Sequence, residues 1–320
     1  MGIREPVMAP LQTERDQTLR SALAAADSSL GDARAVLAHL LRGHDSLLLN
    51  DAVIARVRGI MDDLAQQLAQ AVDAFVSPHA GEVAAPGDHA FTALLVDALF
   101  EVRPLLTHVH ALALEWQLAE RSEARLALDP VLPPLLQARI GADDTDAAAI
   151  AVALLAAQAR FAQAMRRMSL PLQELPGDLF HLALITMRTF AEGQAGAQAE
   201  AHLRRDYNER QTRLGLVERV IIALRDDAAQ ALVLERAGVA LFLTALAIGS
   251  GQDRDSAAFA TAETQIVRLA LSLTACGLTG DGLAAQVLAI HPAAGLPQGL
   301  AELRPDRAAE LLAAHYGGSR

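Results

Sequence analysis

The chain has 320 residues, a formal net charge of −11 and a pI near 5.3, and 52% of its residues are hydrophobic but only 3% aromatic. An acidic chain repels phosphate backbones, and no basic stripe with interleaved aromatic residues occurs, which argues against nucleic-acid binding as the main role. A single cysteine, Cys276, excludes an internal disulfide.

Residues 1–76, the N-terminal segment, are expected to form a long helical hairpin. Its second half carries an apolar stripe with spacings of three and four, the pattern of one helix face. The stripe consists of Leu49, Val53, Val57, Ile60, Leu64, Leu68, Val72 and Phe75. A helix from Ser46 to Val76 would span about 40 Å. That length favours a bundle or the seam of a dimer.

Residues 77–88 are the best candidate for a linker, because they hold two prolines, two glycines and no apolar stripe. A second domain is expected over residues 89–192. Its first helix has Asp88 as a predicted N-cap, and Pro104 predicts a break near Arg103.

Three further helices are expected in this second domain, and the last of them runs from Leu179 to about Phe190. Pro133 and Pro134 favour the start of one, and Thr145 is the predicted N-cap of a long alanine-rich helix. The apolar stripe of that helix consists of Ile150, Leu154, Phe161, Met165 and Met168.

A third domain is expected over residues 193–320. One stripe predicts a continuous helix through Leu203, Tyr207, Leu214, Val217, Ile221 and Leu224. Further helices are expected near Ala228–Ala247 and over Ser256–Cys276. Pro305 and Asp306 open the last one.

These patterns predict an all-α protein of about ten helices, since no strong strand pattern interrupts them. The recurring order of helix, acidic turn, helix and proline loop is typical of stacked helical hairpins, as in an α-solenoid. No fixed sequence period separates such a repeat from a closed bundle. We therefore expect a helical-repeat or bundle body behind the N-terminal hairpin.

One part of the chain resembles a known kind of repeat. The segment from Leu128 to Leu136, the turn at Asp143-Asp144 and the helix after it resemble a HEAT-type hairpin. Residues 170–188 and 278–292 are similar to uncharacterised helical-repeat proteins of alphaproteobacteria. The resemblance covers about the last two thirds of the chain and implies a helical-repeat fold and a bacterial cytoplasmic origin. It implies no activity, and it leaves the N-terminal domain unplaced.

The sequence offers no motif for catalysis, for a cofactor or for a metal. His108 and His110 lie two residues apart and point away from each other on a helix. No HExxH motif and no Cys/His cluster occurs. Asp178 and His181 share a helix face and form a usable pair, but the set of ligands that a di-iron bundle needs does not occur. We therefore predict no catalytic, cofactor-binding or metal-binding residues.

The leading hypothesis is a non-enzymatic protein interaction module, a scaffold or regulator that pairs with an unknown protein partner and forms a homodimer. Its candidate interaction residues are Val53, Val57, Ile60, Leu64, Trp116, Met165 and Met168. Absence of an export signal or a membrane-spanning segment favours the cytoplasm, because the most apolar stretch, Ala237–Gly249, is too short to cross a bilayer.

Two other hypotheses stay open. A loosely packed alanine-rich bundle could enclose an apolar ligand such as a lipid or a quinone. An enzyme could instead assemble its site from distant helices, with Asp178, His181, Glu101 and His108 as the candidates. Clustering of these four side chains in one pocket would separate the two readings.

Overall fold

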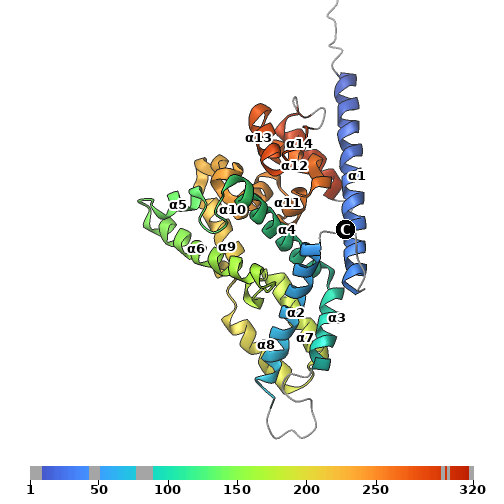
Figure 1. Cartoon of the computed structure of the whole chain (residues 1–320), viewed down its shortest axis with the longest axis vertical. Coiled ribbons are helices and arrows are strands. Elements are labelled where there is room, and N and C mark those ends of the chain that lie inside the picture. The colour runs from blue at the N-terminus through green and yellow to red at the C-terminus, as the bar shows by residue number, and fades with distance from the viewer. Residues whose placement is uncertain (1–8, 43–50, 77–88, 297–299, 301–302, 317–320) are drawn as a thin grey trace, which may run out of the picture.

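The computed structural model describes residues 9–42, 51–76, 89–296, 300 and 303–316 (Figure 1). It is 82% helix, without a strand in the described residues, which confirms the all-α class. These residues form fourteen α-helices and four 3-10 helices, more than the ten expected. The repeat arrangement stays a prediction.

The helices follow one another in a simple order along the chain. The first seven are α1 (Ala9–Arg42), α2 (Asp51–Asp73), α3 (His89–Glu101), α4 (Arg103–Leu126), α5 (Pro134–Ile140), α6 (Thr145–Arg166) and α7 (Gly177–Phe190). The others are α8 (Gln194–Asp206), α9 (Arg213–Leu224), α10 (Leu234–Ser250), α11 (Arg254–Ala260), α12 (Ile266–Ala275), α13 (Gly280–Ile290) and α14 (Pro305–Tyr316). The 3-10 helices are η1 (Leu172–Glu174), η2 (Glu209–Gln211), η3 (Arg225–Leu232) and η4 (Glu263–Gln265).

Proline positions predicted helix boundaries well. The expected break before Pro104 separates α3 from α4 at Val102, and α5 begins at Pro134. The expected N-cap at Thr145 is wrong by one residue, because the Asp144 carboxylate accepts the backbone N–H groups of Asp146 and Ala147. The predicted linker 77–88, with Asp88, lies outside the described residues.

Two expected continuous helices are broken. The stripe from Leu203 to Leu224 is divided between α8 and α9, because Asn208 and Thr212 cap the new helix starts with their side chains. The expected helix Ser256–Cys276 is divided between α11 and α12. Local side-chain caps decided the first break, whereas neither η4 nor α12 has a side-chain cap at the second.

A break also lies inside α10. Gly238 adopts φ 70° and ψ 165°, which interrupts the helix. A Cβ at this position would lie 2.8 Å from the ring of Pro133, which precedes α5. A glycine is therefore required there both by the backbone angle and by the close approach of Pro133.

The long helix α1 lies along one side of the molecule and packs against α12, η4 and α14 (Figure 1). Its buried apolar residues are Leu19, Leu23 and Ala26. Ion pairs join Asp27 to Arg268 and Asp16 to Arg307. The helix α2 instead packs mainly against α3, α4 and α8. The domain boundaries stay a prediction.

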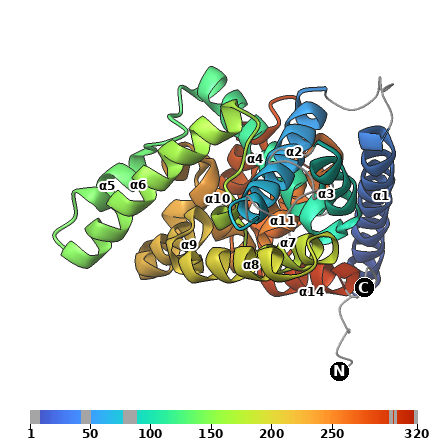
Figure 2. The same cartoon turned by 90° about the horizontal axis from the view of Figure 1, so that it is seen from below.

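At the opposite side, α5 and α6 form a hairpin that projects from the body (Figures 1 and 2). The inner side of α6 packs against α9, and α5 packs against α6 and α10. Phe161 and Met165 of α6 are buried in these contacts. The outer side of α6 has no such cover from the described residues.

The helix α2 organises the chain that follows α6. The Asp63 carboxylate accepts the backbone N–H of Leu170 at 3.0 Å. The Gln67 amide bonds the Leu170 carbonyl at 2.8 Å and the Leu172 N–H at 2.9 Å. This loop turns at Met168, whose φ is 55°. A Cβ on Gly59 of α2 would lie 2.7 Å from the Met168 Cβ.

We expect Gly59→Ala to lower the free energy of unfolding by about 1–3 kcal/mol, because the added methyl group meets Met168 and its backbone. The matched control is Gly31→Ala in α1, where a Cβ meets no atom within 4 Å. That change should raise stability by up to about 1 kcal/mol, since alanine favours a helix. Urea unfolding monitored by circular dichroism measures both, and equal stability of the two variants would contradict the close contact.

Candidate functional site

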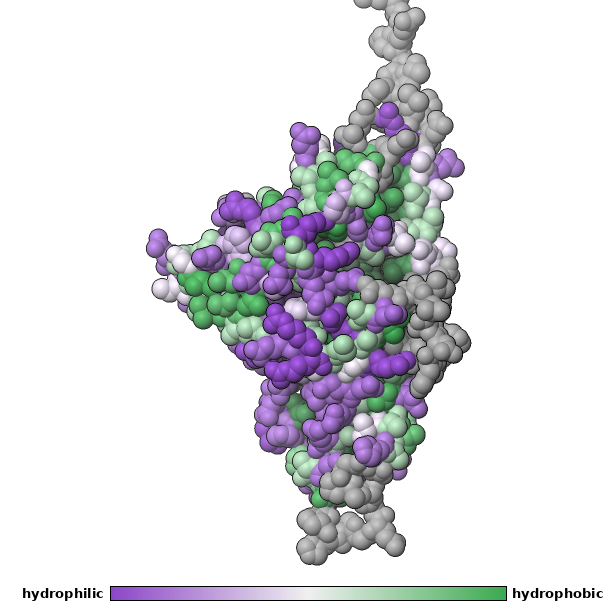
Figure 3. All heavy atoms as spheres, viewed as in Figure 1, coloured by the Kyte–Doolittle hydropathy of each residue, from purple (hydrophilic) through white to green (hydrophobic). Residues whose placement is uncertain are grey.

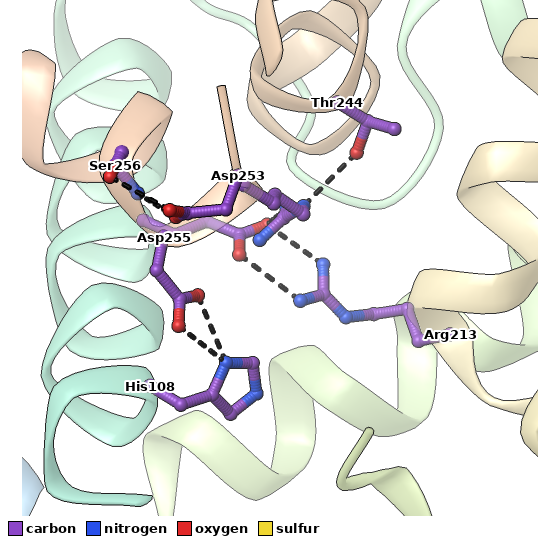
Figure 4. Close-up of polar contacts among 8 residues, drawn as sticks. His108, Arg213, Thr244, Asp253, Asp255 and Ser256 are labelled. Atoms are coloured by element: carbon purple, nitrogen blue, oxygen red, sulfur yellow. Dashed lines mark hydrogen bonds and ion pairs between the residues drawn. The ribbon is translucent and has the colours of Figure 1, made fainter. Parts of the chain in front are cut away.

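The most unusual polar feature is a set of charged side chains inside the helical body (Figure 4). Helix α4 contributes His108 and Glu115, α9 begins with Arg213, and α11 begins with Arg254 and Asp255. We call Glu115, Arg213 and Arg254 the ion cluster. These residues come from three parts of the chain that are far apart in sequence, and the fold brings them together.

The centre of the ion cluster is a two-pronged contact between Glu115 and Arg213. The Arg213 Nη1 and Nη2 atoms donate to the two Glu115 carboxylate oxygens at 2.8 and 3.1 Å. Both side chains are 3% exposed. Two parallel hydrogen bonds fix the guanidinium and carboxylate planes relative to each other, which a single contact cannot do.

The Arg213 guanidinium is also fixed by α6. It lies 3.6 Å from the centroid of the Phe161 ring, and its Nη1 donates to the Gln158 side-chain oxygen at 3.3 Å. An aromatic face attracts a cation, and the attraction is stronger away from water. One arginine therefore joins α9 to both α4 and α6.

Arg254 brings α11 and α10 to the same carboxylate. Its Nη2 lies 2.9 Å from the Glu115 Oε1 atom, and its Nε donates to the Thr244 hydroxyl at 3.0 Å. Asp253 caps the N-terminus of α11 by accepting the Ser256 N–H at 2.6 Å. That cap fixes the start of α11, from which Arg254 and Asp255 reach inward.

Next to the ion cluster, His108 pairs with Asp255. The His108 Nδ1 atom lies 2.9 and 3.1 Å from the two Asp255 carboxylate oxygens. The His108 side chain is 3% exposed, and its buried Nε2 atom has no hydrogen-bond partner among the described residues. This pair joins α4 to the start of α11.

The two carboxylates are held in their charged form. Burial raises the pKa of the Glu115 carboxyl, but Arg213 and Arg254 outweigh burial and hold that pKa at about 2. Burial likewise raises the pKa of Asp255, and the charge and hydrogen bond of His108 overcome it, so that the pKa lies below its usual value.

This arrangement is poor at proton transfer. A carboxylate whose pKa lies near 2 is a weak base at neutral pH. The enclosed space beside Glu115, lined by Trp116, Gln158 and Phe161 among others, has a volume of about 10 Å³. That volume accepts about one water molecule. The ion cluster therefore connects three helices, and the space beside it is small.

Two of the four residues considered for a dispersed site have separate partners. His108 pairs with Asp255, whereas His181 lies 2.7 Å from Arg204 on α8. Among the described residues, no three His, Cys, Asp or Glu side chains lie close enough to hold a metal ion. Burial raises the pKa of the Cys276 thiol to about 12, which makes it unreactive.

Most of the candidate interaction residues lie in the core. Val53, Val57, Ile60, Leu64, Trp116 and Met165 are buried, and only Met168, at 38%, is exposed. Packing within one chain thus explains the apolar stripe of α2. A partner could reach these six only if the helices separated, so their role in an interface stays a prediction.

Sequence reasoning missed the ion cluster. Glu115 stands between Ala111 and Leu118 on one face of α4, and a charge between apolar residues was the available signal. Its partners Arg213 and Arg254 lie 98 residues and more away along the chain. Helical periodicity carries no information about which distant residue neutralises a buried charge.

A second feature lies on the surface. We call Ala149, Val152 and Ala156 the α6 outer face, since all three are exposed, with Val152 at 50%. Figure 3 shows apolar surface over α6 on this side of the molecule. No charged residue occurs between Asp146 and Arg160.

Helix α6 also meets the length and composition of a membrane span, although 44% of its most apolar window is buried. The bent pair α10 and α11, at 110°, meets the same test together. The apolar core helix of a soluble protein also meets this test of length and composition.

Comparison with protein-family models, with curated proteins and with solved structures found no match to this chain. The resemblance to HEAT-like proteins therefore stays a prediction.

We expect Glu115→Gln to lower the free energy of unfolding by about 3–5 kcal/mol, because it leaves two arginines near the core without their carboxylate. The matched control is Glu218→Gln, at an exposed position of α9, which should change stability by less than about 0.5 kcal/mol. Urea unfolding at neutral pH compares the two. Similar losses in both variants would show that the ion cluster does not support the fold.

The Glu115 carboxylate also makes the stability of the fold depend on pH. Its pKa of about 2 in the folded state lies below the ordinary glutamate value of 4.5, so its contribution to stability is complete above pH 4.5 and is lost as pH falls towards 2. The loss amounts to about 3 kcal/mol. The difference in stability between the wild type and Glu115→Gln should shrink as pH falls from 5 to 3 in urea unfolding. A constant difference would contradict the lowered pKa.

Proposed function

We propose that this protein is a non-enzymatic scaffold or regulator of the cytoplasm that presents the α6 outer face to a protein partner. The observation that carries the proposal is an uncharged, exposed helix face on a hairpin that projects from the body (Figure 2). Such faces are common at helix-mediated interfaces, where apolar residues spaced by three and four dock on a partner.

The hairpin is held firmly enough to serve as a binding element. Asp144 caps the start of α6 with two hydrogen bonds, and Phe161 packs under the Arg213 guanidinium. A preformed helix loses little conformational entropy when it binds, so more of the contact energy appears as affinity. The α6 outer face therefore has a fixed shape before a partner arrives.

The contacts of the polar groups inside the body favour a structural role for these groups. Glu115, Arg213 and Arg254 are engaged with one another, and the enclosed space beside them admits about one water molecule. The alternative function, a bundle that binds a lipid or quinone, needs a cavity of several hundred Å³. The space beside the ion cluster is too small to be that cavity.

Replacing Val152 with arginine should remove partner binding and leave the fold intact, since the position is half exposed. Tagged wild type, Val152→Arg and the control Ile222→Arg, at an exposed position of α9, are purified from the native cytoplasm. A stoichiometric protein should accompany the wild type and the control and fall at least tenfold with Val152→Arg.

Two results would overturn the proposal. Equal recovery of the partner with all three proteins would place the binding surface elsewhere. A lipid or quinone that co-purifies in stoichiometric amount, without any protein, would favour the ligand-binding bundle. Native mass spectrometry of the same eluates distinguishes these outcomes.

A further inference from the structure

We infer that the partner of the α6 outer face is a second copy of this chain, paired through an antiparallel contact of α6 with α6 about a two-fold axis. This inference rests on the proposed function of that face as a binding surface. It goes further by naming the occupant, and the charge distribution along α6 is what identifies it.

The two ends of α6 carry opposite charges. Asp143, Asp144 and Asp146 lie at its start, and Arg160, Arg166 and Arg167 lie at its end. Residues 147–159 between them carry no charge. An antiparallel partner of the same sequence would place acidic start against basic end at both ends of the contact. The helix dipoles would also oppose each other favourably.

The spacing of two of these charges fits a symmetric pair. Asp146 and Arg160 each lie seven residues from Ala153, or about two helical turns, so all three share nearly one face. In an antiparallel pair centred near Ala153, Asp146 of one copy lies opposite Arg160 of the other. The two-fold axis makes this contact twice.

The residues between these charges suit a close helix contact. Ala149 and Ala156 lie nearly symmetrically about the centre, and small side chains let two helix backbones approach. Val152, at 50% exposure, would fill the space between them. Burial of this valine on association removes apolar surface from water.

The charges at the two ends are available for a partner. Asp146 and Arg160 are exposed, and no ion pair within the described residues involves either side chain. Arg166, by contrast, already lies 5.7 Å from the centroid of the Trp116 ring. Arg160 is therefore the basic residue that fits the symmetric contact.

Charge reversal tests the pairing directly. Asp146→Arg places two like-charged contacts in the dimer, and so does Arg160→Asp. Each variant alone should raise the dimer dissociation constant about tenfold or more. An equal mixture of the two variants should restore association, because each reversed residue then faces an opposite charge. Sedimentation equilibrium reports the mass, which doubles from 33.8 kDa.

Controls separate loss of pairing from loss of folding. Asp281→Arg reverses an exposed aspartate in the first turn of α13, and Arg236→Asp reverses an exposed arginine of α10. Both should dimerise like the wild type. The chain that carries both Asp146→Arg and Arg160→Asp should also dimerise. It keeps the test decisive if either single variant fails to give a native circular dichroism spectrum.

Several outcomes would overturn the inference. A wild-type protein that stays monomeric up to about 100 μM would overturn the inference. The proposed function would still stand if a different protein accompanies the wild type in the pull-down and is lost with Val152→Arg. If Asp146→Arg and Arg160→Asp each still dimerise like the wild type, the interface lies elsewhere. A mixture that does not re-associate excludes the antiparallel register. If the monomer floats with phosphatidylcholine vesicles and the Val152→Arg variant does not, the α6 outer face is a lipid-binding surface.

Discussion

The contact between Glu115 and Arg213 is the constraint on which the interior of this protein depends. A charged carboxylate within an aliphatic core costs several kcal/mol unless it is paired and hydrogen bonded. Arg213 satisfies it with two hydrogen bonds, and Arg254 adds an ion pair. Because these groups come from α4, α9 and α11, moving any of the three helices away would take a partner from a buried charge.

The same contact reaches the surface of the molecule through α6. Arg213 lies over Phe161 and bonds Gln158, and both belong to the inner side of α6. The inner side is thereby fixed, while the uncharged outer side is exposed at a projecting hairpin. The buried ion cluster and the exposed outer side of α6 thus belong to one packing arrangement.

Helix positions could be predicted where a proline or an apolar period decided them. Pro104 and Pro134 predicted boundaries correctly, and the stripe through Val57 and Leu64 predicted α2. Period alone failed at residues 207–212, because side chains of Asn208 and Thr212 stabilise a turn that the apolar pattern does not reveal. Local polar contacts compete with helical continuity and are weakly encoded in any pattern of hydrophobicity.

The sequence by itself determined that this chain is helical, that aliphatic side chains build its core and that α6 carries acid at one end and arginine at the other. Those features depend on neighbouring residues, which helical spacing makes readable. Tertiary structure alone decided that Glu115 meets Arg213 and Arg254, that Trp116 and Met165 are buried, and that Val152 is exposed. These outcomes depend on which faces of distant helices meet, and a helical period does not specify that choice.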